Sequence, residues 1–268
     1  MMKFLRITKA QGYFVLHKKS FWISFYIMLF FSVVGYLNVV RQGMQVDVYN
    51  MKRASDLFAL HSYSEIIQYF ILLFPLIISF PMAFSGFDEE QGKSATWGIV
   101  RSNRWLYFGS KCFVSFLAGA ILILVPFGLN LLWNAITFMD NGNSWDGLIY
   151  SQLYFSDNEI DFENLYKLHP YGYRLYYLLH LSGFAGICSM FAYAVSNYIK
   201  KYKIFVVLPV YVVFFVSNQL QIEGFCMDDY LLSPLQKKDF CPMLIVEGVL
   251  LILSVIVMTN YIRKKEIL

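Results

Sequence analysis

The fold class is decided by the stretch CFVSFLAGAILILVPFGLNLLWNAITF, residues Cys112–Phe138. It contains no Asp, Glu, Lys, Arg or His. A helix needs roughly 20 apolar residues to cross a hydrocarbon layer of about 30 Å, and this stretch is longer than that. It therefore predicts a transmembrane helix, because a buried helix of a soluble domain rarely needs such a long uncharged run.

The rest of the chain repeats this pattern. Of the 268 residues 58% are hydrophobic and only 15% are charged, which is typical of a membrane protein that crosses the bilayer several times. Backbone polar groups in lipid need internal partners, and the alternating signature of a membrane barrel is absent, so the spans are expected to be helical. The sequence predicts an all-α membrane protein, with one transmembrane domain over residues 1–268 and six spans. The spans are about Phe21–Val40, Ile66–Gly86, Cys112–Phe138, Leu175–Ile199, Ile204–Leu220 and Pro242–Ile262.

The basic residues predict the orientation of these spans. Most of the 22 Lys and Arg fall on one side if both termini face the cytoplasm, in agreement with the positive-inside rule. The net charge of +4 is then a topology signal and indicates no nucleic-acid partner. We expect a multi-pass protein of a bacterial cell membrane, with the lipid bilayer as one partner. The acidic and aromatic loop Met139–Arg174 would lie outside, either as a solvated loop or as a lid for a cationic or amphipathic ligand.

Residues 1–20 have the pattern of an amphipathic helix on the inner membrane surface. Lys3, Arg6 and Lys9 recur at helical spacing among apolar residues such as Phe4 and Phe14. The alternative is a basic cytoplasmic tail.

The last outer loop, Gln221–Cys241, holds apolar residues between acidic ones, which predicts a short segment that re-enters the membrane. Cys226 and Cys241 lie in this loop and form a candidate disulfide, since the exterior is oxidising.

Two catalytic or nucleotide-binding interpretations fail at the segment Phe87–Lys111. Gly92-Lys93-Ser94 lacks the spacing and the preceding strand of a phosphate-binding loop, so no cofactor is expected in this chain. The Glu89-Glu90 pair resembles a motif of abortive-infection-type intramembrane proteases, but Ser94 stands where that motif has Arg. No metal-ligand spacing is present, and the chain is expected not to be an enzyme. An intramembrane protease or other membrane enzyme remains the alternative, and a sensor or assembly protein of the membrane is a third class.

The same segment carries a helical pattern. Trp97, Val100, Arg101 and Arg104 would share one face of a short cytoplasmic helix. Such a helix could lie in the membrane interface or bind a groove on a soluble partner.

The chain resembles the ABC-2 type permeases, the membrane subunits of bacterial ABC exporters. The resemblance lies in the six spans with both ends inside, and in one loop whose matching positions are Glu89, Glu90, Gly92, Arg104 and Gly109-Ser110-Lys111. Lys93 departs from the Gly-Thr pair that the family often has there.

The resemblance implies a transport subunit coupled to a separate ATPase subunit, which would bind ATP and Mg. The coupling residues would be Glu89, Glu90, Gly92, Trp97, Arg101 and Arg104. A second permease chain, identical or different, would pair with this one, and the second and fifth spans would line the pathway. Pathway candidates in the fifth span are Tyr211, Phe214, Phe215 and Asn218, and Pro75, Pro81 and Pro209 would kink the two spans. The substrate would be an amphipathic peptide, a drug or a lipid-like molecule.

Glu247 is expected inside the membrane, because a sixth span that began after it would be too short. An acid at that depth should face protein or water. It is a candidate contact for substrate or a proton, or a structural hydrogen-bond acceptor.

Overall fold

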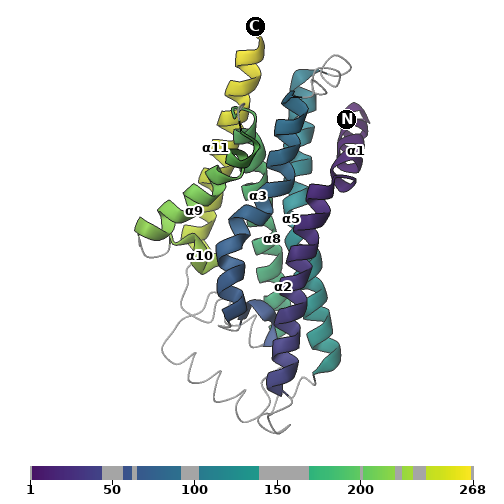
Figure 1. The fold of residues 1–268 in the computed structure, drawn as a ribbon, viewed down its shortest axis with the longest axis vertical. Coiled ribbons are helices and arrows are strands. Elements are labelled where there is room, and N and C mark those ends of the chain that lie inside the picture. The colour runs from purple at the N-terminus through teal and green to yellow at the C-terminus, as the bar shows by residue number, and fades with distance from the viewer. Residues whose placement is uncertain are drawn as a thin grey trace.

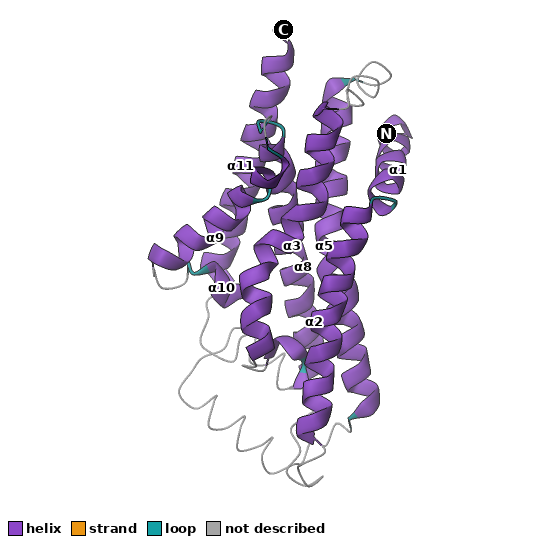
Figure 2. Ribbon diagram, in the orientation of Figure 1, coloured by secondary structure: helices purple, strands orange, loops and turns teal. Residues whose placement is uncertain are grey.

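The structure is a computed structural model that describes residues 2–43, 57–61, 65–91, 103–138, 169–199, 202–220, 225–231 and 240–266. All regular structure in these ranges is helical, which confirms the all-α prediction for them (Figure 2). The helices are α1 (Met2–Leu16), α2 (Lys19–Gly43), η3 (Ala59–His61), α3 (Glu65–Gln91), α5 (Arg104–Thr137), α8 (Pro170–Ser196), η4 (Lys203–Val206), α9 (Leu208–Leu220), α10 (Met227–Tyr230) and α11 (Phe240–Glu266) (Figure 1).

Five of these helices, α2, α3, α5, α8 and α11, are long and apolar enough to cross a membrane. These helices indicate a multi-pass membrane protein. The first, second and sixth predicted spans agree with α2, α3 and α11. The third starts earlier than predicted, at Arg104, because the side chain of Asn103 caps the helix by accepting from the backbone N–H of Trp105. The fourth starts earlier too, at Pro170, where a proline fits the first helical turn.

The predicted fifth span is not a full span in the structure. Helix α9 has 13 residues, about 20 Å at about 1.5 Å per residue, which is less than the hydrocarbon thickness. Pro209 is its second residue, where no intrahelical hydrogen bond is lost. The prediction that Pro209 kinks this helix is therefore wrong, because it lies in the first turn. Short α10 follows, with Met227, Tyr230 and Leu231 all buried, as expected for a segment that packs back against the bundle.

Helix α8 packs against α3, α5 and α11. It lies close to α5, since a Cβ added to Gly119 would be 2.6 Å from the carbonyl oxygen of Ala185. On the same interface, a Cβ on Gly186 would be 2.7 Å from the ring of Phe116. These glycines allow the two backbones to approach, as small residues do between membrane helices.

The two termini lie at the same end of the bundle, next to the end of α3 and the start of α5 (Figure 1). We call this the inner end, following the predicted orientation. Helix α1 buries Gln11 and Val15 and is separated from α2 by a break at His17 and Lys18.

Candidate functional site

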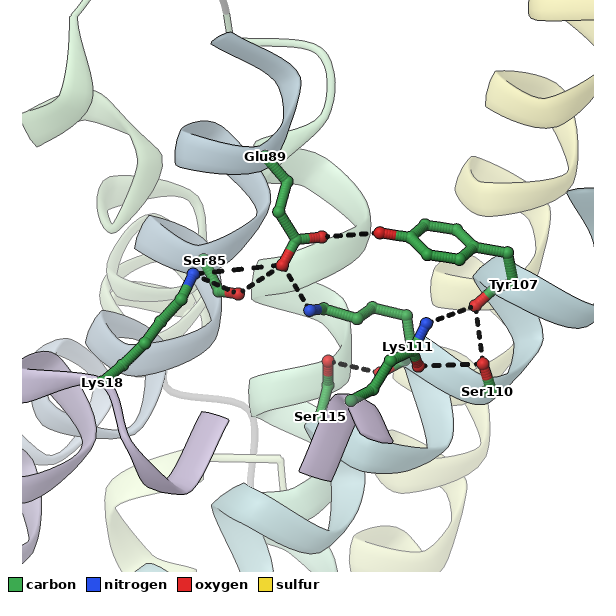
Figure 3. A network of polar contacts seen from close by, with 8 residues as sticks. Lys18, Ser85, Glu89, Tyr107, Ser110, Lys111 and Ser115 are labelled. Carbon is green, nitrogen blue, oxygen red and sulfur yellow. Dashed lines mark hydrogen bonds and ion pairs between the residues drawn. The ribbon is translucent and has the colours of Figure 1, made fainter. Parts of the chain in front are cut away.

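Ionisable side chains meet at the inner end, where the last turns of α3 face the first turns of α5 and the junction of α1 and α2 (Figure 3). We call Lys18, Ser85, Glu89, Tyr107 and Lys111 the inner cluster. These residues come from three separate parts of the chain and converge on one carboxylate.

Glu89 is the centre of the inner cluster. Its Oε1 atom accepts a hydrogen bond from Lys111 Nζ and another from Ser85 Oγ at 3.0 Å. Its Oε2 atom accepts from the Tyr107 hydroxyl at 3.2 Å. Lys18 Nζ lies 3.9 Å from Oε1 and donates to Ser85 Oγ at 2.9 Å. Both carboxylate oxygens are thus engaged (Figure 3).

The contacts of Glu89 matter for stability because the side chains that make them are largely buried. The side chain of Lys111 is 2% exposed and that of Glu89 is 16% exposed, whereas Lys18 is 29% exposed. An ammonium group removed from water is costly unless it is paired and hydrogen-bonded. Glu89 supplies that pairing for Lys111, while Lys18 keeps partial access to solvent.

Helix α1 is tied to α5 beside the inner cluster. Ser110 Oγ donates to Gln11 Oε1 at 2.8 Å, and Gln11 Nε2 donates to the carbonyl oxygen of Tyr107 at 3.3 Å. Since Gln11 is buried, these bonds fix the position of α1 against the start of α5. Tyr107 therefore contacts Glu89 through its hydroxyl group and Gln11 through its backbone.

The predicted coupling residues are only partly brought together. Glu89 lies in the inner cluster. Gly92, Trp97 and Arg101 lie outside the described residues, as does the side chain of Glu90.

The prediction that Arg104 shares one face of a short helix with Trp97, Val100 and Arg101 is wrong. The backbone of Asn103 is extended, with φ −66° and ψ 140°, so Arg104 begins α5 and does not continue a helix from Trp97.

Lys18, Ser85 and Tyr107 were not among the predicted site residues, and Lys111 was known only from the family resemblance. One signal was available in the sequence. Ser85 and Glu89 are four residues apart, and so are Tyr107 and Lys111, a spacing that places side chains on the same helix face. The contact between the two pairs, and the approach of Lys18, depend on the packing of helices and could not be read from spacing.

The predicted pathway residues of α9 have different surroundings. Phe214 is 3% exposed, and its ring centroid lies 5.8 Å from those of Phe74 and Phe184. It is a core residue, so its place in a pathway wall is not supported. Phe215 is 55% exposed, and Tyr211 is half-buried.

Asn218 has a structural contact at the end of α9. Its Oδ1 atom accepts from the backbone N–H of Asp228 at 3.4 Å, which links α9 to α10. Tyr177 of α8 contacts the same segment, because its hydroxyl donates to the carbonyl oxygen of Tyr230 at 2.7 Å.

Glu247 lies within α11 and faces α8, in agreement with the prediction that it faces protein or water. Its Oε1 atom lies 3.6 Å from His180 Nε2, and the two side chains are 13% and 12% exposed. The His180 ring is parallel to that of Tyr176, with centroids 6.4 Å apart. Among the described residues, the acid–imidazole pair Glu247–His180 is the second place where opposite ionisable groups meet between helices.

An apolar groove of about 570 Å³ lies between α5 and α8. Its lining includes Leu124, Gly128, Leu131, Leu175 and Leu178. These side chains offer contacts to hydrocarbon but none that would orient a polar ligand. None of the predicted pathway residues lines this groove.

The described residues contain no group of His, Cys, Asp and Glu that could hold a metal ion. The side chain of Cys241 lies outside the described part, so its pairing with Cys226 stays a prediction. Comparisons with protein-family models, with curated proteins and with solved structures found no match.

Proposed function

We propose that this chain is the membrane-spanning subunit of an ATP-driven exporter of the ABC-2 type. A separate ATPase subunit would hydrolyse ATP, and a second permease chain would complete the pathway. The substrate would be an amphipathic peptide, a drug or a lipid-like molecule, moved out of the cell or the membrane.

The observation that carries this proposal is the inner cluster. Residues 92–102 connect α3 to α5, and the contacts of Glu89 with Lys111 and Tyr107 join the two helix ends beside that segment. Lys18 adds the junction of α1 and α2 to the same carboxylate. A force applied to the segment by a soluble partner would therefore move three parts of the bundle together.

The force would also reach α8. A Cβ on Gly86, one turn before Glu89, would lie 3.1 Å from the Tyr193 ring and would also meet Ser196 Oγ. The end of α3 thus rests directly on the end of α8, with little space to absorb a displacement. Since packed helices are poorly compressible, movement at the inner end would pass to the membrane-spanning part.

The test is purification of the tagged full-length chain from its native membrane in mild detergent. We expect a nucleotide-hydrolysing subunit to co-purify, and export of a fluorescent amphipathic dye to fall in Glu89→Gln while the partner stays bound. Lys19→Gln is the control for loss of a charge elsewhere at the inner end, since Lys19 is exposed and carries no contact to Glu89 in the described structure. Absence of an ATPase, together with unchanged export in Glu89→Gln, would overturn the proposal.

The Glu247–His180 pair favours a second candidate, an intramembrane hydrolase. An imidazole beside a carboxylate could activate water as a general base. In that case the purified chain alone should cleave a membrane-embedded substrate, and His180→Gln should abolish cleavage. Cleavage that survives His180→Gln, or no cleavage without an ATPase, would exclude this candidate.

A further inference from the structure

Helix α1 presents a basic face that the bundle does not cover. Gln11 and Val15 are buried against the bundle, whereas Lys3, Arg6 and Lys9 are all exposed. No ion pair joins any of these three residues to another residue that the structure describes. Their charges are thus available to a partner outside the chain.

Large apolar side chains are interleaved with these charges. Leu5 is 57% exposed, Tyr13 is 61% exposed and Phe14 is 64% exposed. At about 100° per residue they lie on the same outward half of the helix as the basic residues. A face on which exposed aromatic and aliphatic groups alternate with Lys and Arg is suited to the headgroup region of a bilayer, where both kinds of group are satisfied.

The position of α1 fixes what it can reach. It ends at Leu16, and the first candidate membrane span begins three residues later, at Lys19. Trp22 Nε1 donates to the Leu16 carbonyl oxygen at 2.7 Å, which holds the end of α1 against the start of that span. The C-terminal end of α1 is therefore held within a few residues of the start of the first candidate membrane span.

Charge complementarity selects the lipid. The sequence contains no Asp or Glu before Asp47, so no acidic group of α1 repels an anionic headgroup. Lys18 is excluded from this face because it contacts Glu89 and Ser85. We propose that the outward face of α1 binds anionic phospholipid headgroups in preference to zwitterionic ones, through Lys3, Arg6 and Lys9.

The experiment uses the full-length protein in nanodiscs with photoactivatable phosphatidylglycerol or photoactivatable phosphatidylcholine as the probe. The label on peptides that contain residues 2–16 is quantified by mass spectrometry. A basic residue near an anionic surface contributes about 1 kcal/mol, so loss of two removes about 2 kcal/mol, and we expect the double variant Arg6→Gln/Lys9→Gln to reduce phosphatidylglycerol labelling roughly thirtyfold. Arg6→Lys/Lys9→Arg should retain it, and phosphatidylcholine labelling should be unchanged.

Arg263→Gln/Lys264→Gln is the matched control, because it removes the same charge from two exposed residues of α11. It should leave the labelling of α1 unchanged. Unlabelled phosphatidylglycerol should compete with the probe, whereas soluble glycerol phosphate should not. The proposal is overturned if the two probes label α1 equally in the unmodified protein, if the Gln variants keep the label, or if the control lowers it to the same extent. Monodisperse elution and unchanged helix content must accompany each variant, so that a loss of label reports binding.

Discussion

Glu89 and Glu247 are two carboxylates that lie between helices, and they are held in different ways. Glu89 contacts Ser85, Tyr107, Lys111 and Lys18, which come from three parts of the chain. Glu247 faces one imidazole, that of His180, at 3.6 Å, and its Oε1 atom makes no hydrogen bond with any described residue.

The difference separates two uses of a buried charge. Several hydrogen bonds to one carboxylate fix its position and satisfy its lone pairs, so the helices around it move as a unit. A carboxylate with a single distant partner can exchange that partner at little cost. The inner cluster is thus suited to transmitting a displacement, and the Glu247–His180 pair to a contact that forms and breaks.

Removal of Glu89 should have the largest effect on stability. Glu89→Ala leaves the ammonium of Lys111, which is 2% exposed, without its carboxylate. Loss of one partner of a buried pair costs about 3–5 kcal/mol, so we expect a reduction of that order in the free energy of unfolding. The measurement is unfolding in mixed micelles with increasing sodium dodecyl sulfate.

The double variant Glu89→Ala/Lys111→Met gives the control for this prediction. It removes the buried charge together with its partner, so it should be more stable than Glu89→Ala alone. If the stability losses of Glu89→Ala and of Lys111→Met, each measured alone, add up to the loss of the double variant, Lys111 does not depend on Glu89. The contrast between Glu89 and Glu247 then fails.

The tight crossing of α5 and α8 should give the next largest effect. Gly186→Ala places a methyl group 2.8 Å from the Phe116 carbonyl oxygen as well as against its ring, and overpacking of this kind costs about 1–3 kcal/mol. Gly183→Ala, on the same helix, meets nothing within 4 Å and should gain up to about 1 kcal/mol from helix propensity. The ranking of the two variants by thermal unfolding checks whether α8 packs as tightly on α5 as the structure shows. Equal stability would show that α8 can move away from α5.

The sequence predicted the fold better than the site. Hydropathy can be summed over neighbouring residues of the chain, whereas the packing of helices depends on residues that are far apart in the sequence. Apolar runs located α2, α3 and α11 well, since each predicted run is long and contains no charged residue except Glu247 in the last. The fifth span was overestimated because hydropathy cannot show that a helix begins only at Leu208. Hydropathy also misses a cap, and the cap formed by Asn103 moved the start of α5.

Glu89 was predicted as a site residue, and Glu247 was predicted inside the membrane from a length argument alone. Their partners were not predicted, because a contact such as that between His180 and Glu247 joins residues far apart in the sequence. Only the spacing of four residues within each helix was visible beforehand. The meeting of those helices depends on side-chain shape, in particular on glycines such as Gly86 and Gly119 that let backbones approach.

Replacement of the Glu247–His180 pair should have a smaller effect on stability than loss of Glu89. Replacement of both members of a buried polar pair by apolar side chains can be nearly neutral or stabilising. The free energy of unfolding of Glu247→Leu/His180→Leu should therefore lie no more than about 1 kcal/mol below that of the unmodified protein. Dye export should nevertheless fall if the pair contacts substrate. A stability loss as large as that of Glu89→Ala would show that Glu247 is as firmly held as Glu89, and a stable, fully active double variant would remove Glu247 from the pathway.

The smallest effect is expected for Lys18→Gln. Lys18 Nζ is 3.9 Å from Glu89 and the side chain is 29% exposed, and a partly exposed pair of this length contributes about 0.2–1 kcal/mol. The contribution should vanish near 1 M salt, where the screening length is about 3 Å, whereas the cost of Glu89→Ala should persist because Lys111 is buried. Unfolding measured at low and high salt therefore separates the two lysines of the inner cluster. If Lys18→Gln instead abolishes export at unchanged stability, the tie between the α1–α2 junction and Glu89 serves transmission of force and adds little to the stability of the fold.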